Sequence, residues 1–255
     1  IKDNSKIGTV KGGDATASGK DGGYGIRNHG QFTMSGGTIT NAVGGKATGR
    51  TGDGGDGIYC GDTLTIEGGE IQQTTGGEAT GKSGTGGSGI RGGSGIRGGS
   101  SNKIVEISGG TIAKAKGGEG KASGGYGIRS DGELKIEGGT IGSLTTDDNG
   151  KQIPDPTTGA LGGNAATGEQ GGHGIYSKGQ LFISDGANII NAKGGDSQKN
   201  GGDGIRSDGE LTIEGGKIKQ ATGGGATGES GTGGHGIRSK IVKILGGIIT
   251  KAKGG

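Results

Sequence analysis

One phrase returns along this chain at a regular distance. The segment "DGIRSDGELTIEGG" at 203–216 shares "GIRSDGEL" with 127–134 and "LTIEGG" with 64–69. The isoleucines of its Gly-Ile pairs keep a fixed separation of 32 residues in three cases: Ile26 to Ile58, Ile58 to Ile90 and Ile205 to Ile237. Self-similarity with a period of about 20–50 residues is the signature of repeats that stack on one another. We therefore expect about eight stacked repeats.

Each repeat has three parts, written G-I-R/Y, L-x-I-x-G-G and x-I-x-x-A. Alternation in L-T-I-E predicts a short strand with Leu and Ile inward, and the Gly-Gly pair permits a sharp turn. The apolar positions form three columns: Phe32, Leu64, Val105, Leu134, Leu181, Leu211 and Val242; Met34, Ile66, Ile107, Ile136, Ile183, Ile213 and Ile244; Ile39, Ile71, Ile112, Ile141, Ile189, Ile218 and Ile249. Small residues follow the third column: Ala42, Ala115, Ala192, Ala221 and Ala252.

These features predict an all-β fold, a right-handed parallel β-helix (solenoid) with about 32-residue repeats and glycine-rich extended corners. Residues 1–255 are expected to be one domain of about eight repeats with both ends open. Inserted loops are expected near 89–103 and 145–163. Because "GIRGGS" is written twice at 89–100, either Ile90 or Ile96 is the marker of that repeat.

Glycine makes up 74 of the 255 residues, and much of it lies in arms between the repeats. The arms end with glycine at every third position, as at Gly49, Gly52 and Gly55. This period suits polyglycine- or polyproline-II-like segments that pack backbone against backbone. A flat glycine-rich β extension and a flexible linker are the alternatives. In the first two cases the arms would stack on one another.

Composition excludes several classes of protein. The net charge is only +3 and aromatic residues make up 2%, so neither a concentrated basic face nor a base-stacking surface is expected, and we predict no nucleic-acid partner. No apolar run reaches the length of a membrane span. The single cysteine, Cys60, cannot form an internal disulfide. The chain starts without Met, which favours a mature or truncated piece of something longer.

The segments "GIRSDGELTIEGGKI" and "GIRNHGQFTMSGGTIT" resemble the repeats of bacterial right-handed β-helix surface proteins, which are common in clostridia. The resemblance covers nearly the whole chain. It implies the β-helix fold and a cell-surface location, and some members of that family bind plant cell-wall polysaccharide with calcium. The glycine arm makes each repeat longer than the commonest form of that repeat.

A candidate binding strip follows the Gly-Ile pairs. Each of its members is an arginine or a tyrosine: Arg27, Tyr59, Arg91 (or Arg97), Arg129, Tyr176, Arg206 and Arg238. One inter-strand distance apart, guanidinium planes can stack on each other and on Tyr rings, and Asp131 and Asp208 can relieve the repulsion between them. Arginine also binds carboxylates in a two-pronged geometry, so the strip is a candidate for acidic polysaccharide. The alternative is a solvated ladder that keeps the register.

Other polar groups give weaker predictions. Glu67, Glu137, Asp185 and Glu214 recur with the repeat, whereas a catalytic pair should break the pattern at one place, so no enzyme is expected. Asp53, Asp56, Asp196 and Asp203 lie near glycine turns, and Asp147 and Asp148 lie in the insertion, which leaves calcium binding possible although surface turns account for them. His173 and His235 lack metal-ligand spacing, and Cys60 occupies the slot of Ser130, Ser177 and Ser207.

The sequence therefore predicts an extracellular structural or surface protein that forms a fibre or matrix by end-to-end stacking. The alternative is an adhesin module that binds acidic polysaccharide through the Arg/Tyr strip. No catalytic residue, metal ligand or cofactor is assigned.

Overall fold

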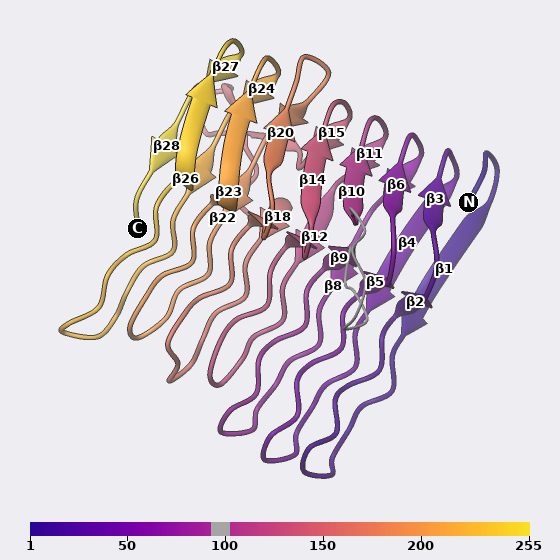
Figure 1. Ribbon diagram of the computed structural model, residues 1–255, viewed down its shortest axis with the longest axis vertical. Coiled ribbons are helices and arrows are strands. Elements are labelled where there is room, and N and C mark those ends of the chain that lie inside the picture. Colours follow the sequence, from indigo (N-terminus) through magenta and orange to yellow (C-terminus); the bar gives the residue numbers. More distant parts are fainter. Residues whose placement is uncertain (93–102) are drawn as a thin grey trace.

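The computed structural model describes residues 1–92 and 103–255, which contain strands and turns but no helix. The second copy of "GIRGGS", with Ile96 and Arg97, lies outside the described residues. Corresponding strands of successive repeats lie side by side, and the glycine arms extend from one side of the body as a row of narrow loops (Figure 1). The predicted all-β class and its parallel sheets are confirmed. No helix of the described residues is long and apolar enough to cross a membrane.

The larger sheet has 14 strands in two parallel ladders. Strands β1 (Lys6–Lys11) and β4 (Thr38–Val43) are long enough to belong to both ladders. The ladder of the third apolar column continues through β7 (Glu70–Ile71), β11 (Thr111–Ile112), β15 (Thr140–Ile141), β21 (Asn188–Ile189), β24 (Lys217–Ile218) and β27 (Ile248–Ile249). The ladder of the small residues continues through β8 (Thr74–Thr75), β12 (Lys114–Lys116), β18 (Gly159–Leu161), β22 (Ala192–Lys193), β25 (Ala221–Thr222) and β28 (Ala252–Lys253).

The smaller sheet has 12 strands, again in two parallel ladders. The Gly-Ile segments form β2 (Ile26–Asn28), β5 (Ile58–Cys60), β9 (Ile90–Gly92), β13 (Ile128–Ser130) and β19 (Ile175–Ser177). The L-x-I segments form β3 (Phe32–Met34), β6 (Leu64–Ile66), β10 (Ile104–Ile107), β14 (Glu133–Ile136) and β20 (Leu181–Ile183). In the last two repeats both segments merge into β23 (Ile205–Ile213) and β26 (Ile237–Ile244).

The register places equivalent residues of neighbouring repeats opposite one another. Ile26 pairs with Ile58, Ile58 with Ile90, and Ile90 with Ile128. The L-x-I strands pair in the same way, as Phe32 with Leu64 and Met34 with Ile66. Since a one-residue slip would turn every apolar side chain outward, this register keeps the columns buried. Among the described residues, Ile90 is therefore the isoleucine that marks the third Gly-Ile pair of the stack.

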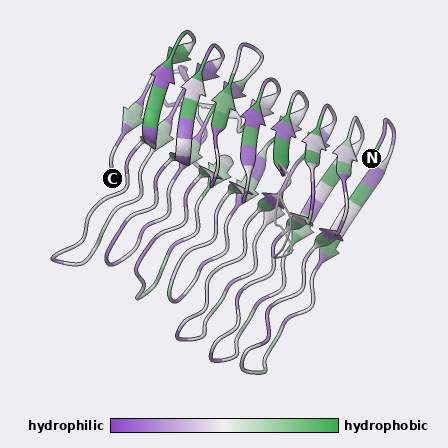
Figure 2. Cartoon of the chain, in the orientation of Figure 1, coloured by the Kyte–Doolittle hydropathy of each residue, from purple (hydrophilic) through white to green (hydrophobic). Residues whose placement is uncertain are grey.

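The three predicted apolar columns form one core, and from Phe32 to Ile218 nearly all their members are at most 1% exposed. Hydrophobic residues gather on the strands of the body, whereas the arms are pale or polar (Figure 2). Three residues join the five predicted members of the ladder of small residues: Val10, Thr74 and Ala160. Thr74 is buried there because its hydroxyl donates to the carbonyl oxygen of Gly89 at 2.7 Å, and Ala160 pairs with Ala115 and Ala192.

The arms consist of an outgoing layer, which follows the small-residue ladder, and a returning layer, which leads to the next Gly-Ile pair. Within the outgoing layer Gly44 donates its N–H to Thr75 of the next repeat, and within the returning layer Gly54 donates to Thr85. An unbroken series of main-chain hydrogen bonds joins the two layers, and in it each glycine donates its N–H to the carbonyl oxygen of the glycine before it. The members of the series are Gly13, Gly23, Gly45, Gly55, Gly77, Gly87, Gly118, Gly125, Gly163, Gly172, Gly195, Gly202, Gly224, Gly234 and Gly255.

This arrangement decides between the three predictions for the arms. A flat β ribbon forms its hydrogen bonds within one plane, whereas these glycines bond both within a layer and across the two layers. The prediction that the arms stack backbone on backbone is confirmed. A Cβ on Gly76 would overlap the carbonyl oxygen of Gly87 in the returning layer, so a side chain is excluded at the contact between the layers.

The insertion after β15 is an antiparallel hairpin of β16 (Leu144–Thr146) and β17 (Gln152–Pro154). It begins after Gly142 and ends before Gly159, and both glycines have positive φ. The expected loop at 145–163 therefore extends too far, since Gly159–Leu161 belongs to the larger sheet. The side-chain amide of Asn191, in the next repeat, donates to the carbonyl oxygens of Thr158 and Asp155 and holds the base of the hairpin.

Candidate functional site

The smaller sheet gathers the Arg/Tyr strip into one column. Parallel pairing places Arg27 opposite Tyr59, Arg129 opposite Arg91 and Tyr176, and Arg206 opposite Arg238. From here on, "the ladder" means this Arg/Tyr column and not the strand ladders of the sheets. Its described members are Arg27, Tyr59, Arg91, Arg129, Tyr176, Arg206 and Arg238. Its ends, Arg27 and Arg238, are exposed, whereas Tyr176 is buried at 8% exposure.

A second column lies three residues before the ladder, where the returning arm joins the body. Its members are Tyr24, Asp56, Ser88, Tyr126, His173, Asp203 and His235. The rings of the two columns are in contact: Tyr126 stacks on Tyr176 with 5.0 Å between centroids, and Tyr24 packs against Tyr59 at 4.7 Å with the rings tilted by 34°. The guanidinium of Arg129 lies 4.9 Å from the Tyr126 ring, a favourable cation–π distance. The predicted packing of guanidinium groups on Tyr rings is therefore present, within the ladder as Arg129 on Tyr176 at 5.9 Å and between the two columns.

Carboxylates of the chain neutralise most of the ladder. Arg91 and Arg129 both donate to Asp131, with Nη2–Oδ distances of 2.9 and 2.6 Å. The Nε atom of Arg206 donates to Asp208 at 2.8 Å, and the Tyr176 hydroxyl donates to the same carboxylate at 2.7 Å. The predicted role of Asp131 and Asp208 in relieving repulsion is confirmed. The charges that would bind an acidic ligand are thus largely satisfied within the chain.

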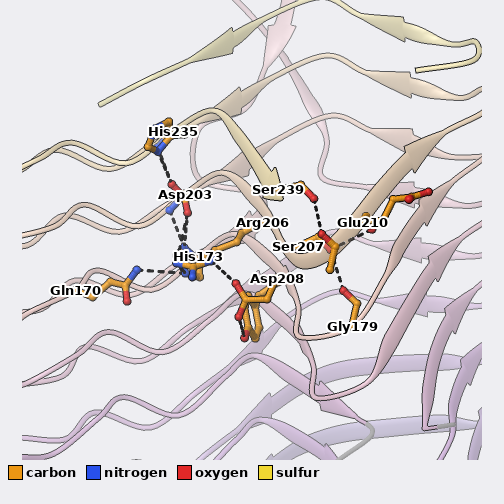
Figure 3. A network of polar contacts seen from close by, with 12 residues as sticks. Gln170, His173, Gly179, Asp203, Arg206, Ser207, Asp208, Glu210, His235 and Ser239 are labelled. Atoms are coloured by element: carbon orange, nitrogen blue, oxygen red, sulfur yellow. Dashed lines mark hydrogen bonds and ion pairs between the residues drawn. The ribbon is translucent and has the colours of Figure 1, made fainter. Parts of the chain in front are cut away.

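The second column contains a buried network that the sequence did not reveal (Figure 3). His173 and Asp203 are each 1% exposed. The main-chain N–H of Asp203 donates to Nδ1 of His173 at 2.7 Å, and Asp203 Oδ1 accepts the main-chain N–H of His235 at 2.7 Å. These bonds join three successive repeats. The histidines, which the sequence treats as tolerated variants, therefore take part in holding the repeats together.

His173 is held at both ring nitrogens. Nδ1 accepts the main-chain N–H of Asp203, and Nε2 lies 3.4 Å from Nε2 of Gln170 and 3.3 Å from Nη1 of Arg206. Burial lowers the pKa of His173 to about 4, although Asp203 favours the charged form; Arg206 adds to the lowering. His173 is thus a neutral structural imidazole across the physiological range.

Asp56 is the counterpart of Asp203 in the first half of the chain. It is 3% exposed, and its Oδ1 accepts the main-chain N–H of Ser88 at 2.6 Å. Burial raises the pKa of Asp56 to about 6, and Arg91, 3.8 Å away, opposes this rise. Its second oxygen, Oδ2, is buried and has no hydrogen-bond partner.

The aspartates considered as calcium ligands accept hydrogen bonds from main-chain N–H groups. An Oδ1 atom accepts the main-chain N–H of the next repeat in four cases: Asp53 from Thr85, Asp56 from Ser88, Asp196 from Gly225 and Asp203 from His235. Asp147 accepts two N–H groups in the hairpin turn. Among the residues that the structure describes, no group of three or more His, Cys, Asp or Glu side chains is placed to hold a metal ion.

The remaining candidates also follow the repeat. Glu67, Glu137, Asp185 and Glu214 are all exposed on the outer face. Cys60 and its serine counterparts are buried and bond to turn carbonyls; Cys60 contacts the carbonyl oxygen of Gly30, and Ser177 that of Gly132. These side chains tie each turn to the preceding one, a role that the prediction of a merely small residue missed.

No protein-family model, no curated protein and no solved structure matches the chain. The resemblance to bacterial β-helix surface proteins therefore stays a prediction, and the functional argument depends on the chain's own residues.

Proposed function

We propose that the chain is a right-handed parallel β-helix solenoid with repeats of about 32 residues, and that it serves as an extracellular structural or surface protein. The observation that carries this proposal is the continuous series of inter-layer hydrogen bonds from Gly13 to Gly255, which accompanies the parallel sheets along the whole stack. A stack bonded in this way is a stiff element whose length grows with repeat number.

The polar columns support a structural role. Asp131 joins Arg91 to Arg129, and Asp203 joins His173 to His235, in each case across neighbouring repeats. The carboxylates, histidines and serines of these columns thus form hydrogen bonds that hold neighbouring repeats in register. They are not gathered into one polar cluster that differs from the rest of the repeats. This use of polar groups suits a scaffold better than an enzyme.

End-to-end association is part of the proposal. The last repeat exposes five large hydrophobic residues, Ile241, Val242, Ile244, Leu245 and Ile248, which are 46–71% exposed. Val242 and Ile244 continue the buried columns, since they pair with Leu211 and Ile213. Unpaired strand edges beside apolar side chains are templates for a further strand. A second copy that adds its strands there would bury this surface, and repetition of the same contact would give a filament.

Electron microscopy of the natively produced protein, with antibody labelling of intact cells, tests this function. Surface label and filaments with an axial repeat of about 35–40 Å, from eight repeats at roughly 4.8 Å each, are the expected result. Isolated short rods would overturn the filament, and label confined to the cell interior would overturn the extracellular role.

The second candidate is an adhesin module that binds acidic polysaccharide through the ladder. Arg27 and Arg238, exposed at the two ends, favour it. It is the weaker candidate because Asp131 and Asp208 already bind Arg91, Arg129 and Arg206. Binding to polygalacturonate that weakens as salt rises, and that Arg27→Gln with Arg238→Gln abolishes, would support it.

A further inference from the structure

The chain contains two Asn-Gly pairs, Asn149-Gly150 in the inserted hairpin and Asn200-Gly201 in the arm between β22 and β23. Glycine carries no side chain, so in this dipeptide its main-chain nitrogen can approach the amide carbon of the asparagine. Intramolecular attack on that carbon, favoured by proximity, is the first step of deamidation. Both asparagines are exposed. Because the dipeptide is the same in both places, the surroundings decide which of the two reacts.

Asn149 lies at the tip of the hairpin formed by β16 and β17. The main-chain N–H of Gly150 donates to the carbonyl oxygen of Asp147 at 2.9 Å, and Gly150 has a left-handed φ of 77°. Gly150 is exposed, and a Cβ at this position would meet no described atom within 4 Å. The space around the reacting nitrogen is therefore open, and only the bond to Asp147 engages it.

Few interactions keep this turn closed. Among the described strands, β16 and β17 pair only with each other, over the three positions Leu144–Thr146 and Gln152–Pro154. Thr145, Thr146 and Gln152 are exposed. A two-stranded hairpin of this kind is marginally stable in water. Its local opening frees the nitrogen of Gly150 and leaves the strands of the body paired.

Asn200 is held in the stacked arms instead. It forms parallel bridges with Gln170 of the preceding repeat and Thr232 of the following one. Its side-chain amide donates to the carbonyl oxygen of Glu169 at 3.0 Å, and the N–H of Gly201 donates to that of Thr232 at 2.9 Å. Gly201 is buried, and a Cβ there would overlap main-chain atoms of the next repeat. Attack by this nitrogen requires that the arm leave the stack.

We propose that Asn149 is a site of spontaneous deamidation in the folded protein, whereas Asn200 is protected. The main-chain nitrogen of Gly150 gives its proton to water and bonds to Cγ of Asn149. The Cγ–Nδ2 bond breaks, and the amide group takes up a proton and leaves as ammonia. Water then opens the cyclic imide at either carbonyl and gives aspartate or isoaspartate. The product adds a negative charge beside Asp147 and Asp148. This inference does not depend on the proposed structural function.

Incubation of the purified chain in mildly alkaline buffer over several days tests the proposal. Mass spectrometry of the tryptic peptide 136–151 follows Asn149, and that of the peptide 200–206 follows Asn200. Samples taken at the start correct for conversion during digestion. Asn149 should convert at least about tenfold faster than Asn200. In the urea-unfolded chain the two should convert at similar rates, which separates protection by the structure from intrinsic reactivity.

Two matched variants assign the reaction to one residue. Asn149→Gln should remove most of the ammonia release from the folded chain, because the longer side chain would have to close a larger ring. Asn200→Gln should leave the release unchanged, and circular dichroism shows that each variant is folded. Methylation by an isoaspartyl methyltransferase identifies the isoaspartate product. Equal rates of Asn149 and Asn200 in the folded chain, or conversion of Asn149 in urea only, would overturn the proposal.

Discussion

The main-chain N–H of Gly77 donates a 2.7 Å hydrogen bond to the carbonyl oxygen of Gly55, and the two residues lie in opposite layers of the arms. Gly55 in turn donates to Gly45 at 3.0 Å, so each repeat is bonded to the next through both layers. This contact requires that two backbones approach without a side chain between them. The high glycine content is thus explained by packing rather than by flexibility.

Gly76→Ala should therefore destabilise the protein. The new Cβ would overlap the carbonyl oxygen of Gly87 in the opposite layer, and forced overpacking typically costs about 1–3 kcal/mol. Gly13→Ala is the control, since a Cβ there meets nothing within 4 Å. Urea unfolding followed by circular dichroism measures both. Equal midpoints for the two variants would show that the layers are not in contact.

Removal of residues 143–158 should leave the stack intact. The deletion joins Gly142 to Gly159 and gives I-G-G-A, the spacing of I-T-N-A at 39–42. Because the amide of Asn191 would lose its partners, Asn191→Ala should accompany the deletion. We expect an unchanged far-ultraviolet spectrum and a melting temperature within a few degrees of the parent. An unfolded product would mean that the hairpin is needed for folding.

How far the sequence predicts the structure differs between its parts. The apolar columns were predicted member by member because period-two alternation and the fixed repeat depend only on local spacing. Ala160 was missed since the insertion separates it from Ile141 in sequence, although not in the sheet. The choice between Ile90 and Ile96 was open because both belong to identical copies of "GIRGGS".

The site was less predictable. The ladder followed from the Gly-Ile pairs, but its pairing with the second column depends on how the returning arm meets the body. No spacing rule places the His173 ring against Tyr126 and Tyr176, which lie 5.4 and 5.6 Å from it.

His173 makes stability depend on pH. Its pKa is lowered from 6.5 to about 4, so the unfolded chain binds its proton more readily than the folded chain. The stabilisation is complete above pH 6.5 and is lost as the pH falls towards 4, by up to about 3 kcal/mol. Asp56 acts in the opposite sense, because its raised pKa favours folding at the lower pH.

A comparison of variants isolates the histidine. The free energy of unfolding of the parent should fall more steeply between pH 6.5 and 4 than that of His173→Gln. His29→Gln, at an exposed position, should follow the parent. Parallel curves for the parent and His173→Gln would contradict a buried neutral imidazole.

Tyr176→Phe tests the hydrogen bond by which the ladder residue Tyr176 is held to Asp208. The substitution keeps the ring that stacks on Tyr126 and removes the hydroxyl that donates to Asp208. Loss of a hydrogen bond to a charged group should cost about 1.5–3 kcal/mol. The double variant with Asp208→Asn should lose less than the sum of the single changes, since both remove the same bond. Strict additivity in chemical denaturation would argue against the contact.

Amide hydrogen exchange of the arms is the most direct test of the account, because the stacked layers distinguish this structure from a body with loose glycine linkers. Peptides that cover 44–57 and 76–89 should exchange as slowly as those of the sheets, since the N–H groups of Gly44, Gly45, Gly76 and Gly77 are bonded to neighbouring repeats. Exchange at the rate of an unstructured peptide in the arms, with protection confined to the body, would contradict it.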